Sequence, residues 1–365
     1  MNINEYKEIV KETALNEYPS YYQDKIIKSL KEKELVFNDK RSKNKKKLLD
    51  ISSAEKSKDK LRIILDNLPV GVKEIEKFEY DRAYRYCALF SIYNYSDSLL
   101  DDLKKLDYIK EFSDNVNEFD TIKFTAMKPT YKIDSEKTIL KFSFLLKNKE
   151  DNTKSIKYTV LAIIYKQIDV LEIRLDTIHF VYKEKEEFYN DKIHSVLAWL
   201  DSVLNLKIKN GKRVHIRNID FEPTVKYMKS QKTDDVTIVA LKMRRDGMMA
   251  YLDASSNEDL TIPILGELKK LLTKNECVFN RNKDTKEINE LLDTFIKEIE
   301  ETSSLPSVKI LWREKKIKVL LTHNYRGEKY TLFKYSDELS DKEMMGYVTR
   351  YLIECKKELD EESVD

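Results

Sequence analysis

Residues 158–183 contain no proline or glycine and have a high density of Val, Ile, Leu, Tyr and Phe, which is typical of strands that pack on a core. Residues 158–164 are almost all apolar, as expected for a strand buried on both faces. Over residues 170–183, apolar and charged positions alternate, which predicts a strand with one buried face and one charged face. The apolar run at 138–146 precedes these two strands and can pair with the first of them, and residues 167–169 form the turn between the two. The pattern therefore predicts an antiparallel meander.

Helical spacing of apolar residues predicts helices at 3–15, 21–33, 187–206, 286–301 and 342–357. The pattern at 187–206 predicts a strongly amphipathic helix, because its apolar residues fall on or near one face. We expect this helix to cover one face of the sheet that the meander forms.

The second half of the chain returns to a strand pattern. Residues 235–252 predict two strands around Asp246 and Gly247, a pair of residues typical of a tight hairpin. Residues 308–335 predict a three-stranded meander, which the helix at 342–357 follows.

This order of elements predicts an α+β class, with a helical N-terminal part followed by antiparallel-sheet units that amphipathic helices cover. It also predicts three domains. Residues 1–118 form a mostly helical domain, 119–210 an antiparallel sheet plus a helix, and 211–365 a second α+β unit with the C-terminal meander and helix. The acidic, polar segment at 114–120 marks the first boundary, and a strand is expected at 121–126.

The charge balance changes what can be expected of partners. The chain of 365 residues has 67 Lys and Arg against 65 Asp and Glu, so its formal net charge is only +2. No global positive field attracts nucleic acid, and any such binding needs a local patch. Six glycines and six prolines argue against glycine-rich phosphate loops and proline-rich linkers.

The three cysteines, Cys87, Cys277 and Cys355, lie far apart and form no CxxC motif. This spacing argues against a disulfide framework and against a cysteine zinc site. The first residues lack the apolar core of a signal peptide, and no run approaches the roughly 18 apolar residues that span a bilayer. We expect a reduced cytoplasmic protein without membrane association, cofactor or metal ion.

Two local stretches are candidates for nucleic-acid binding. The first is the densest basic run, with six positive side chains: Lys40, Arg41, Lys43, Lys45, Lys46 and Lys47. Such a run is usually a solvated loop, and the alternative is a patch that contacts phosphates. It contains no aromatic residue, so base stacking is not indicated there.

The second candidate is the stretch at 78–90, where the aromatic residues Phe78, Tyr80, Tyr84 and Tyr86 lie beside Arg82 and Arg85. Tyrosine and arginine together can stack on and clamp a nucleic-acid strand. They can equally form the amphipathic seam of a helix, with the arginine stems packed over it.

Two short motifs bear on catalysis. Glu267 and Lys269 resemble the Glu-x-Lys half of PD-(D/E)xK nucleases, in which the acid holds Mg²⁺; Asp253 and Asp259 are the nearby carboxylates. In that fold the motif lies on a strand, whereas here it follows Pro263 in a predicted helix.

Arg174 to His179 has the Arg-x4-His spacing of HEPN ribonucleases, but on a predicted strand the two side chains point to opposite faces. No catalytic residue can be assigned.

These observations favour a non-enzymatic cytoplasmic module that binds DNA or RNA through the local basic and Tyr/Arg-rich surfaces, within a multi-protein system. A metal-dependent nuclease of a mobile-element or phage-defence system is one alternative. An obligate subunit of a protein complex is another, which exposed apolar patches would support.

The first prediction concerns the basic run. Charge reversal at Lys45, Lys46 and Lys47 weakens DNA or RNA binding and flattens its salt dependence, because fewer counterions are released from phosphates. Filter binding at two salt concentrations, with and without Mg²⁺, measures both effects and also detects cleavage. No change in affinity or in salt dependence would count against the run as a contact.

Overall fold

The computed structural model describes residues 3–37, 48–113, 128–206, 212–254, 265–336 and 342–362. Over these residues the chain consists of helices and a mostly antiparallel sheet, with helices at the N-terminus, which confirms the predicted α+β class. The predicted strand at 121–126 and boundary at 114–120 lie outside the described residues. None of the described helices is long and apolar enough to cross a bilayer.

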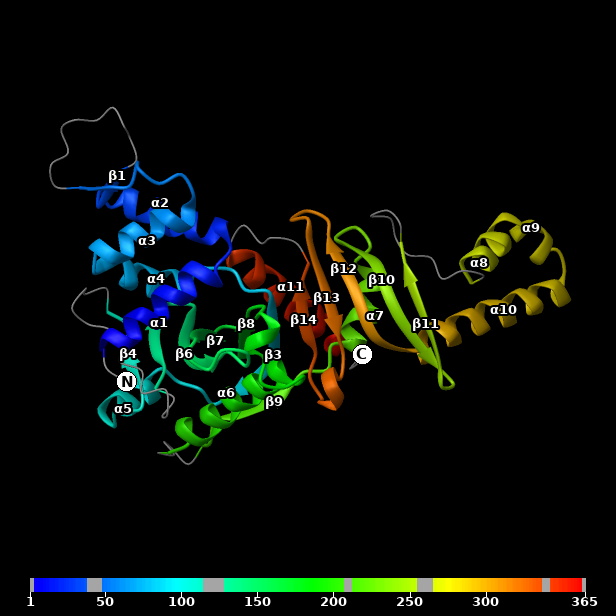
Figure 1. Ribbon diagram of the computed structural model, residues 1–365. Coiled ribbons are helices and arrows are strands. Elements are labelled where there is room, and N and C mark those ends of the chain that lie inside the picture. Colours follow the sequence, from blue (N-terminus) through cyan, green and yellow to red (C-terminus); the bar gives the residue numbers. More distant parts are fainter. Residues whose placement is uncertain are drawn as a thin grey trace. The chain divides into compact units, whose positions relative to one another are not determined.

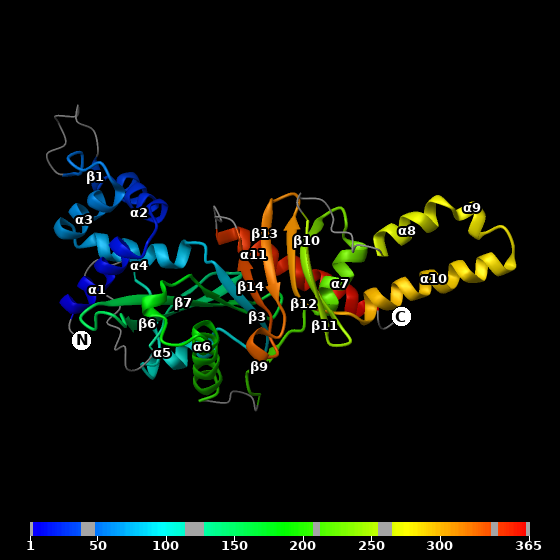
Figure 2. The same ribbon diagram turned by 45° about the vertical axis from the view of Figure 1, so that its right-hand side comes forward.

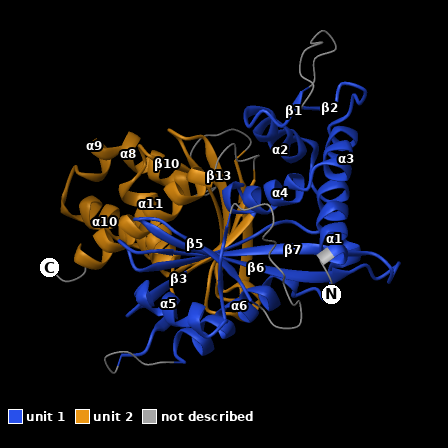
Figure 3. Ribbon diagram, turned by 90° about the vertical axis from the view of Figure 1, so that its left-hand side faces the viewer, with its two compact units in different colours: residues 1–85, 90–217 blue, residues 86–89, 218–365 orange. Residues whose placement is uncertain are grey.

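Contacts divide the chain into two compact units (Figure 3). Unit 1 consists of Met1–Arg85 and Phe90–Arg217, and unit 2 of Tyr86–Leu89 and Asn218–Asp365. Strand β3 (Tyr86–Tyr93) therefore contributes its first half to unit 2 and its second half to unit 1. The three domains expected from sequence, as independently folding parts, stay a prediction.

Unit 1 begins with four helices that pack on one another (Figure 1): α1 (Ile3–Asn16), α2 (Ser20–Glu32), α3 (Ser57–Asn67) and α4 (Val70–Asp81). Their apolar faces form one core, which includes Tyr6, Ile26, Leu61 and Ile75. Prolines precede α2 and α4, in agreement with the preference of proline for helix starts. A short parallel pair, β1 (Val36–Phe37) and β2 (Leu49–Asp50), borders this core.

The sheet of unit 1 contains the predicted meander: β6 (Lys137–Lys147), β7 (Ser155–Tyr165) and β8 (Val170–Leu175), antiparallel in turn. Strand β8 is the neighbour of β3 in the sheet, while β5 (Thr130–Ile133) and β4 (Lys110–Glu111) extend the sheet beyond β6. The short strand β9 (His215–Asn218) pairs with β3.

Helices lie on both faces of this sheet. On one face, the ring of Phe142 packs against Trp199 and that of Tyr158 against Phe188, both from α6 (Phe188–Leu204). This confirms the predicted covering helix, which α5 (Ser98–Lys105) contacts. On the other face, α1 packs across β7, and the amide of Lys157 donates to Thr13 Oγ1 at 2.9 Å.

One expectation for β8 is wrong. Its alternation predicted an exposed charged face, but Glu172 and Arg174 are buried, with 0% and 3% of their surface exposed. The Arg174 guanidinium bonds both carboxylate oxygens of Glu172 at 2.9 and 3.0 Å, and Tyr165 Oη donates to the same carboxylate at 2.7 Å. Because the guanidinium and the carboxylate neutralise each other, this face of the strand can be buried. The strand also ends at Leu175, before the 3₁₀ turn η1 (Phe180–Tyr182).

In unit 2 the sheet has the order β11-β10-β12-β13-β14, followed by the first half of β3, and is antiparallel throughout. The strands are β10 (Val236–Arg245), β11 (Met248–Asp253), β12 (Ser304–Trp312), β13 (Ile317–Thr322) and β14 (Leu332–Tyr335), with the 3₁₀ turn η2 (Tyr325–Gly327) before β14. Both the predicted hairpin and the predicted C-terminal meander are confirmed. Asp246 and Gly247 have φ of 50° and 78°, as a type I′ turn requires.

Two helices of unit 2, α7 (Glu222–Gln231) and α11 (Lys342–Glu362), lie behind the sheet in Figure 1. Phe221, just before α7, packs its ring on Phe333, and Tyr351 of α11 packs on Trp312. The strand side chains on this face are buried: Val308, Ile310, Val319, Leu321, Phe333 and Tyr335. The other face carries a different set of side chains, described below.

The last part of unit 2 is a helical arm that extends away from its sheet (Figure 2). It consists of α8 (Leu265–Lys274), α9 (Glu276–Phe279) and α10 (Lys283–Thr302). Helices α8 and α10 confirm the helices predicted after Pro263 and at 286–301, whereas α9 was not predicted. A capping box between Asn282 and Thr285 begins α10. Near its other end, Glu300 accepts a hydrogen bond from Lys269 of α8 at 2.7 Å.

Candidate functional site

The basic run predicted to contact phosphates lies outside the described residues, since it falls within 38–47. Its six cations, Lys40, Arg41, Lys43, Lys45, Lys46 and Lys47, therefore remain a sequence-based prediction.

The Tyr/Arg-rich stretch at 78–90 is divided among three local structures. It contains the end of α4, a connection and the start of β3. Arg82 follows α4 and is buried, with its guanidinium carbon 5.6, 5.3 and 4.1 Å from the ring centres of Tyr18, Tyr22 and Tyr84. It also forms an ion pair with Asp176. This cation is enclosed by its own fold and does not face outward, and Arg85 is half-buried.

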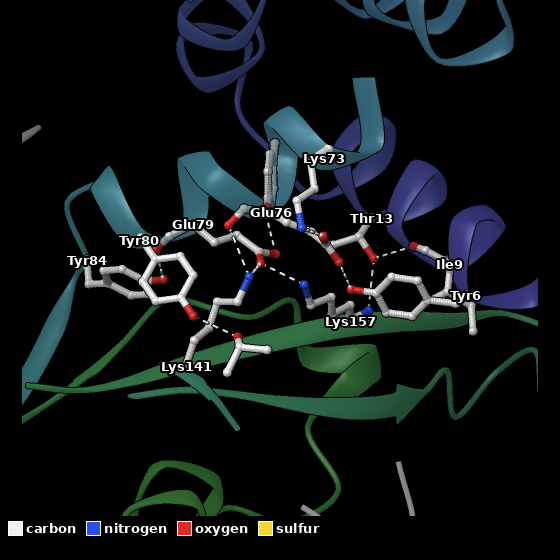
Figure 4. A network of polar contacts seen from close by, with 12 residues as sticks. Tyr6, Ile9, Thr13, Lys73, Glu76, Glu79, Tyr80, Tyr84, Lys141 and Lys157 are labelled. Atoms are coloured by element: carbon white, nitrogen blue, oxygen red, sulfur yellow. Dashed lines mark hydrogen bonds and ion pairs between the residues drawn. The ribbon is translucent and has the colours of Figure 1, made fainter. Parts of the chain in front are cut away.

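A buried polar cluster of unit 1 lies between α4 and the sheet (Figure 4). Glu79 of α4 accepts hydrogen bonds from Lys157 of β7 at 2.6 Å and from Lys141 of β6 at 3.2 Å. The other oxygen of this carboxylate accepts from Tyr18 at 3.1 Å, and the Glu79 carbonyl accepts from Tyr84 at 2.7 Å. All three charged side chains are at most 1% exposed.

A second carboxylate, one turn earlier on α4, extends this cluster toward α1. Glu76 accepts a hydrogen bond from Tyr6 of α1 and lies 3.7 Å from the ammonium of Lys73. The backbone carbonyl of Glu76 accepts from Lys141 at 3.0 Å. The cluster thus joins α1, α4, β6 and β7.

Electrostatics explain how the cluster exists in a closed interior. Burial alone raises the pKa of Glu79, but Lys157 and Lys141 outweigh this effect and lower its pKa from 4.5 to about 2. Glu79 is therefore ionised at neutral pH and cannot act there as a proton donor. Because the three side chains are closed to solvent, we interpret the cluster as a structural cross-link.

The nuclease-like motif lies on a helix, as predicted. Glu267 of α8 is exposed, and Lys269 pairs with Glu300. Asp253, at the end of β11, accepts from Tyr251 Oη at 3.3 Å, and Asp259 lies outside the described residues. Across the part of the chain that the structure describes, no three His, Cys, Asp or Glu side chains are grouped to hold a metal ion. The nuclease hypothesis therefore gains no support and stays a prediction.

The remaining catalytic candidates are also in structural positions. Arg174 is held by Glu172 inside the sheet, while His179 lies beyond the end of that strand. His323 is buried, its Nδ1 is 2.9 Å from Thr331 Oγ1, and burial lowers its pKa, so it is neutral at pH 7. Burial, together with Glu358, raises the pKa of the Cys355 thiol to about 11, which keeps it protonated.

A different arrangement appears on the sheet face of unit 2 that α7 and α11 do not cover. Residues directly opposite each other on paired strands point to the same face. Lys309 is opposite Leu320, Leu320 opposite Lys334, and Lys334 opposite Tyr86. These four side chains therefore form one row across β12, β13, β14 and β3.

Neighbouring rows add further cations to this surface, which we call the basic face. Lys242 is opposite Tyr251 in β11, Arg244 is opposite Met249, and Lys318 is opposite Leu311. The complete set of cations on the face is Lys242, Arg244, Lys309, Lys318 and Lys334, all exposed or half-buried. On the described strands β10 to β14, the same register places one carboxylate there, that of Asp253.

The basic face was not predicted from the sequence, although a signal was present. In each of β12, β13 and β14 one lysine lies between two buried apolar residues, as Lys309 does between Val308 and Ile310. This period of two predicts which residues leave the core. It does not predict that lysines of separate strands come together, because that depends on strand order and register.

The chain was compared with protein-family models and with curated protein sequences, and it matches none of them. Its function must therefore be inferred from the geometry.

The second prediction tests the cross-link. Lys157→Met should lower the free energy of unfolding by about 1–3 kcal/mol, because Glu79 loses the shorter of its two lysine hydrogen bonds while Lys141 still compensates its charge. Urea unfolding followed by circular dichroism measures this. The control is Lys104→Met, which breaks the exposed pair with Glu111 and should have a far smaller effect, because solvent screens that pair. Similar losses for both variants would contradict the proposed role of the cluster.

The third prediction concerns the pH dependence of the same cluster. Since the pKa of Glu79 is lower in the folded chain, its charge stabilises the fold above pH 4.5, and this contribution is lost as the pH falls toward 2. Glu79→Gln removes the titrating group. The stability difference between wild type and variant should therefore be largest at neutral pH and shrink over that range. A difference that is constant with pH would show that another group is responsible.

Proposed function

We propose that this protein is a non-enzymatic module that binds nucleic acid through the basic face of unit 2. The observation that carries the proposal is the row formed by Lys309, Leu320, Lys334 and Tyr86, in which cations and apolar side chains share one open sheet surface. Lysine ammonium groups attract phosphates, and aromatic and aliphatic side chains give bases a surface to contact.

The charge distribution supports the proposal. With a net charge of +2, the whole chain gives no long-range attraction for a polyanion. The basic face, however, carries five cations against the single carboxylate of Asp253 on its described strands. Among the residues that the structure describes, Lys309, Lys318 and Lys334 form no ion pair, so these ammonium groups do not have to leave a carboxylate partner to meet a phosphate.

The basic run at 40–47 stays a second proposed contact of the same function. It belongs to unit 1, whereas the basic face belongs to unit 2, and each can be tested by itself.

The fourth prediction tests the basic face. The double variant Lys309→Glu with Lys334→Glu should weaken DNA or RNA binding. It should also lower the slope of log affinity against log salt by about 0.7–0.9 for each phosphate that is no longer neutralised. Fluorescence anisotropy with labelled oligonucleotides at several salt concentrations measures both quantities.

The matched control reverses two exposed cations of α11, the helix on the opposite face. Arg350→Glu with Lys357→Glu makes the same change in net charge, and should leave affinity and salt slope near those of wild type. If both double variants weaken nucleic-acid binding equally, the change in net charge explains the loss of affinity. That result would contradict a role for the basic face.

One observation favours a second candidate function, that of a subunit in a protein complex. Ile288, Leu291 and Phe295 of α10 are 51%, 65% and 51% exposed. Their spacing of three and four residues places them in one stripe on the helix. A contiguous exposed apolar stripe of this kind marks a protein contact.

For this stripe we propose a second copy of the same chain as the partner. On α10, the stripe is bordered by Asp284 and Glu287, while α8 of the same arm exposes Lys270 and Lys274. Helix α10 of one copy and α8 of another therefore have complementary charges, and two arms can pack their apolar stripes together.

The fifth prediction follows from this pairing. The wild-type chain should form dimers at micromolar concentration, and Phe295→Glu should be monomeric, as light scattering coupled to size-exclusion chromatography measures. Lys297→Glu, two residues on and on the opposite side of α10, is the control and should remain dimeric. A wild-type chain that is monomeric at every concentration would refute self-association.

A further inference from the structure

A pocket of about 240 Å³ opens on the basic face. The residues that line it include Tyr251, Leu320, the cations Lys309 and Lys334, and the hydroxyl-bearing Ser307 and Ser336. Aromatic, apolar, cationic and hydroxyl side chains therefore surround one small volume.

The size of the pocket limits what it can hold. Pockets for drug-sized ligands have volumes of roughly 300–1,000 Å³. A space of about 240 Å³ accommodates one small ring system, and is too small for a complete dinucleotide cofactor. Because the pocket is open on the sheet surface, a group that remains attached to a longer chain can enter it.

The chemistry of the walls matches one nucleotide of such a chain. Tyr251 is 62% exposed, so its ring is available for a planar base to stack on. Leu320 gives a base an apolar contact, and the two serine hydroxyls can donate to or accept from its polar edge. Lys309 and Lys334 provide positive charge for the phosphate attached to it.

The carboxylate of Asp253 determines how a nucleotide would be oriented in the pocket. It accepts a hydrogen bond from Tyr251 Oη at 3.3 Å and therefore lies beside the ring. A phosphate is repelled from this side and attracted to the lysines. The base should thus lie toward Tyr251, and the backbone toward Lys309 and Lys334.

We infer that the pocket holds one unpaired base, and that the nucleic acid this face binds is single-stranded. In a duplex both faces of a base are covered by its neighbours, so only an unstacked base can place its face on Tyr251. This inference rests on the proposed function and adds the class of nucleic acid and the residue that selects it.

The experiment compares Tyr251→Ala, Tyr251→Phe and wild type for binding to a labelled single strand and to the corresponding duplex. Loss of one stacked base should weaken single-strand binding by about 5- to 150-fold in Tyr251→Ala. Tyr251→Phe keeps the ring and should bind within about 3-fold of wild type. Duplex binding should be the weaker of the two and should change little in either variant.

Phe180→Ala is the matched control, since Phe180 is an equally exposed aromatic residue, at 66%, in unit 1. It should bind the single strand like wild type. Circular dichroism checks the fold of each variant, and Tyr251 lies on the edge strand β11, where truncation removes little packing.

Several outcomes would overturn the inference, and they can be separated from failure of the proposed function. If Lys309→Glu with Lys334→Glu weakens binding but Tyr251→Ala does not, the basic face binds nucleic acid without a base pocket. Equal losses for single strand and duplex in Tyr251→Ala, or equal losses in Tyr251→Ala and Tyr251→Phe, also refute stacking of an unpaired base. If wild type binds no nucleic acid, both proposals fail.

Discussion

The architecture of unit 1 depends on an ionised carboxylate held between two lysines. Lys141 and Lys157 lie on neighbouring strands and point to the same side, so α4 must place Glu79 over both. The adjacent bonds, from Tyr6 to Glu76 and from the Lys157 amide to Thr13, attach α1 to the same point. Helices whose apolar faces could pack in several orientations are thereby fixed in one, because any other leaves buried charges without partners.

In unit 2 the alternation of side chains along the strands determines which residues form the core and which form the open surface. The period of two along β12, β13 and β14 sends apolar residues to the side that α7 and α11 cover, and lysines to the other side. The buried half is a conventional core. The basic face therefore has a positive charge that the net charge of the chain does not reveal, because the acidic residues that balance it lie elsewhere in the chain.

Sequence patterns predicted most helices and strands of the fold, but few of the contacts between charged side chains. The meander, the covering helix and the Asp246–Gly247 hairpin follow from local periodicity and turn chemistry. The burial of Glu172 and Arg174 was not predictable, because a charged residue becomes an interior residue only when a partner from the fold neutralises it. The basic face was missed for a related reason: Lys309 and Lys334 are 25 positions apart in the sequence, and become neighbours across β13 only through strand register.

The triad of Glu79, Lys141 and Lys157 also constrains how this sequence can evolve. Replacing Glu79 by an apolar residue leaves two ammonium groups in the interior without their carboxylate, and replacing either lysine removes one of the two hydrogen bonds that this carboxylate accepts from them. Replacement of all three together can be neutral. Neutral drift through single steps is therefore blocked at these positions. Among descendants of this chain, positions 79, 141 and 157 should change jointly or not at all, and this covariation would link a helix to two strands more than 60 residues away in the sequence.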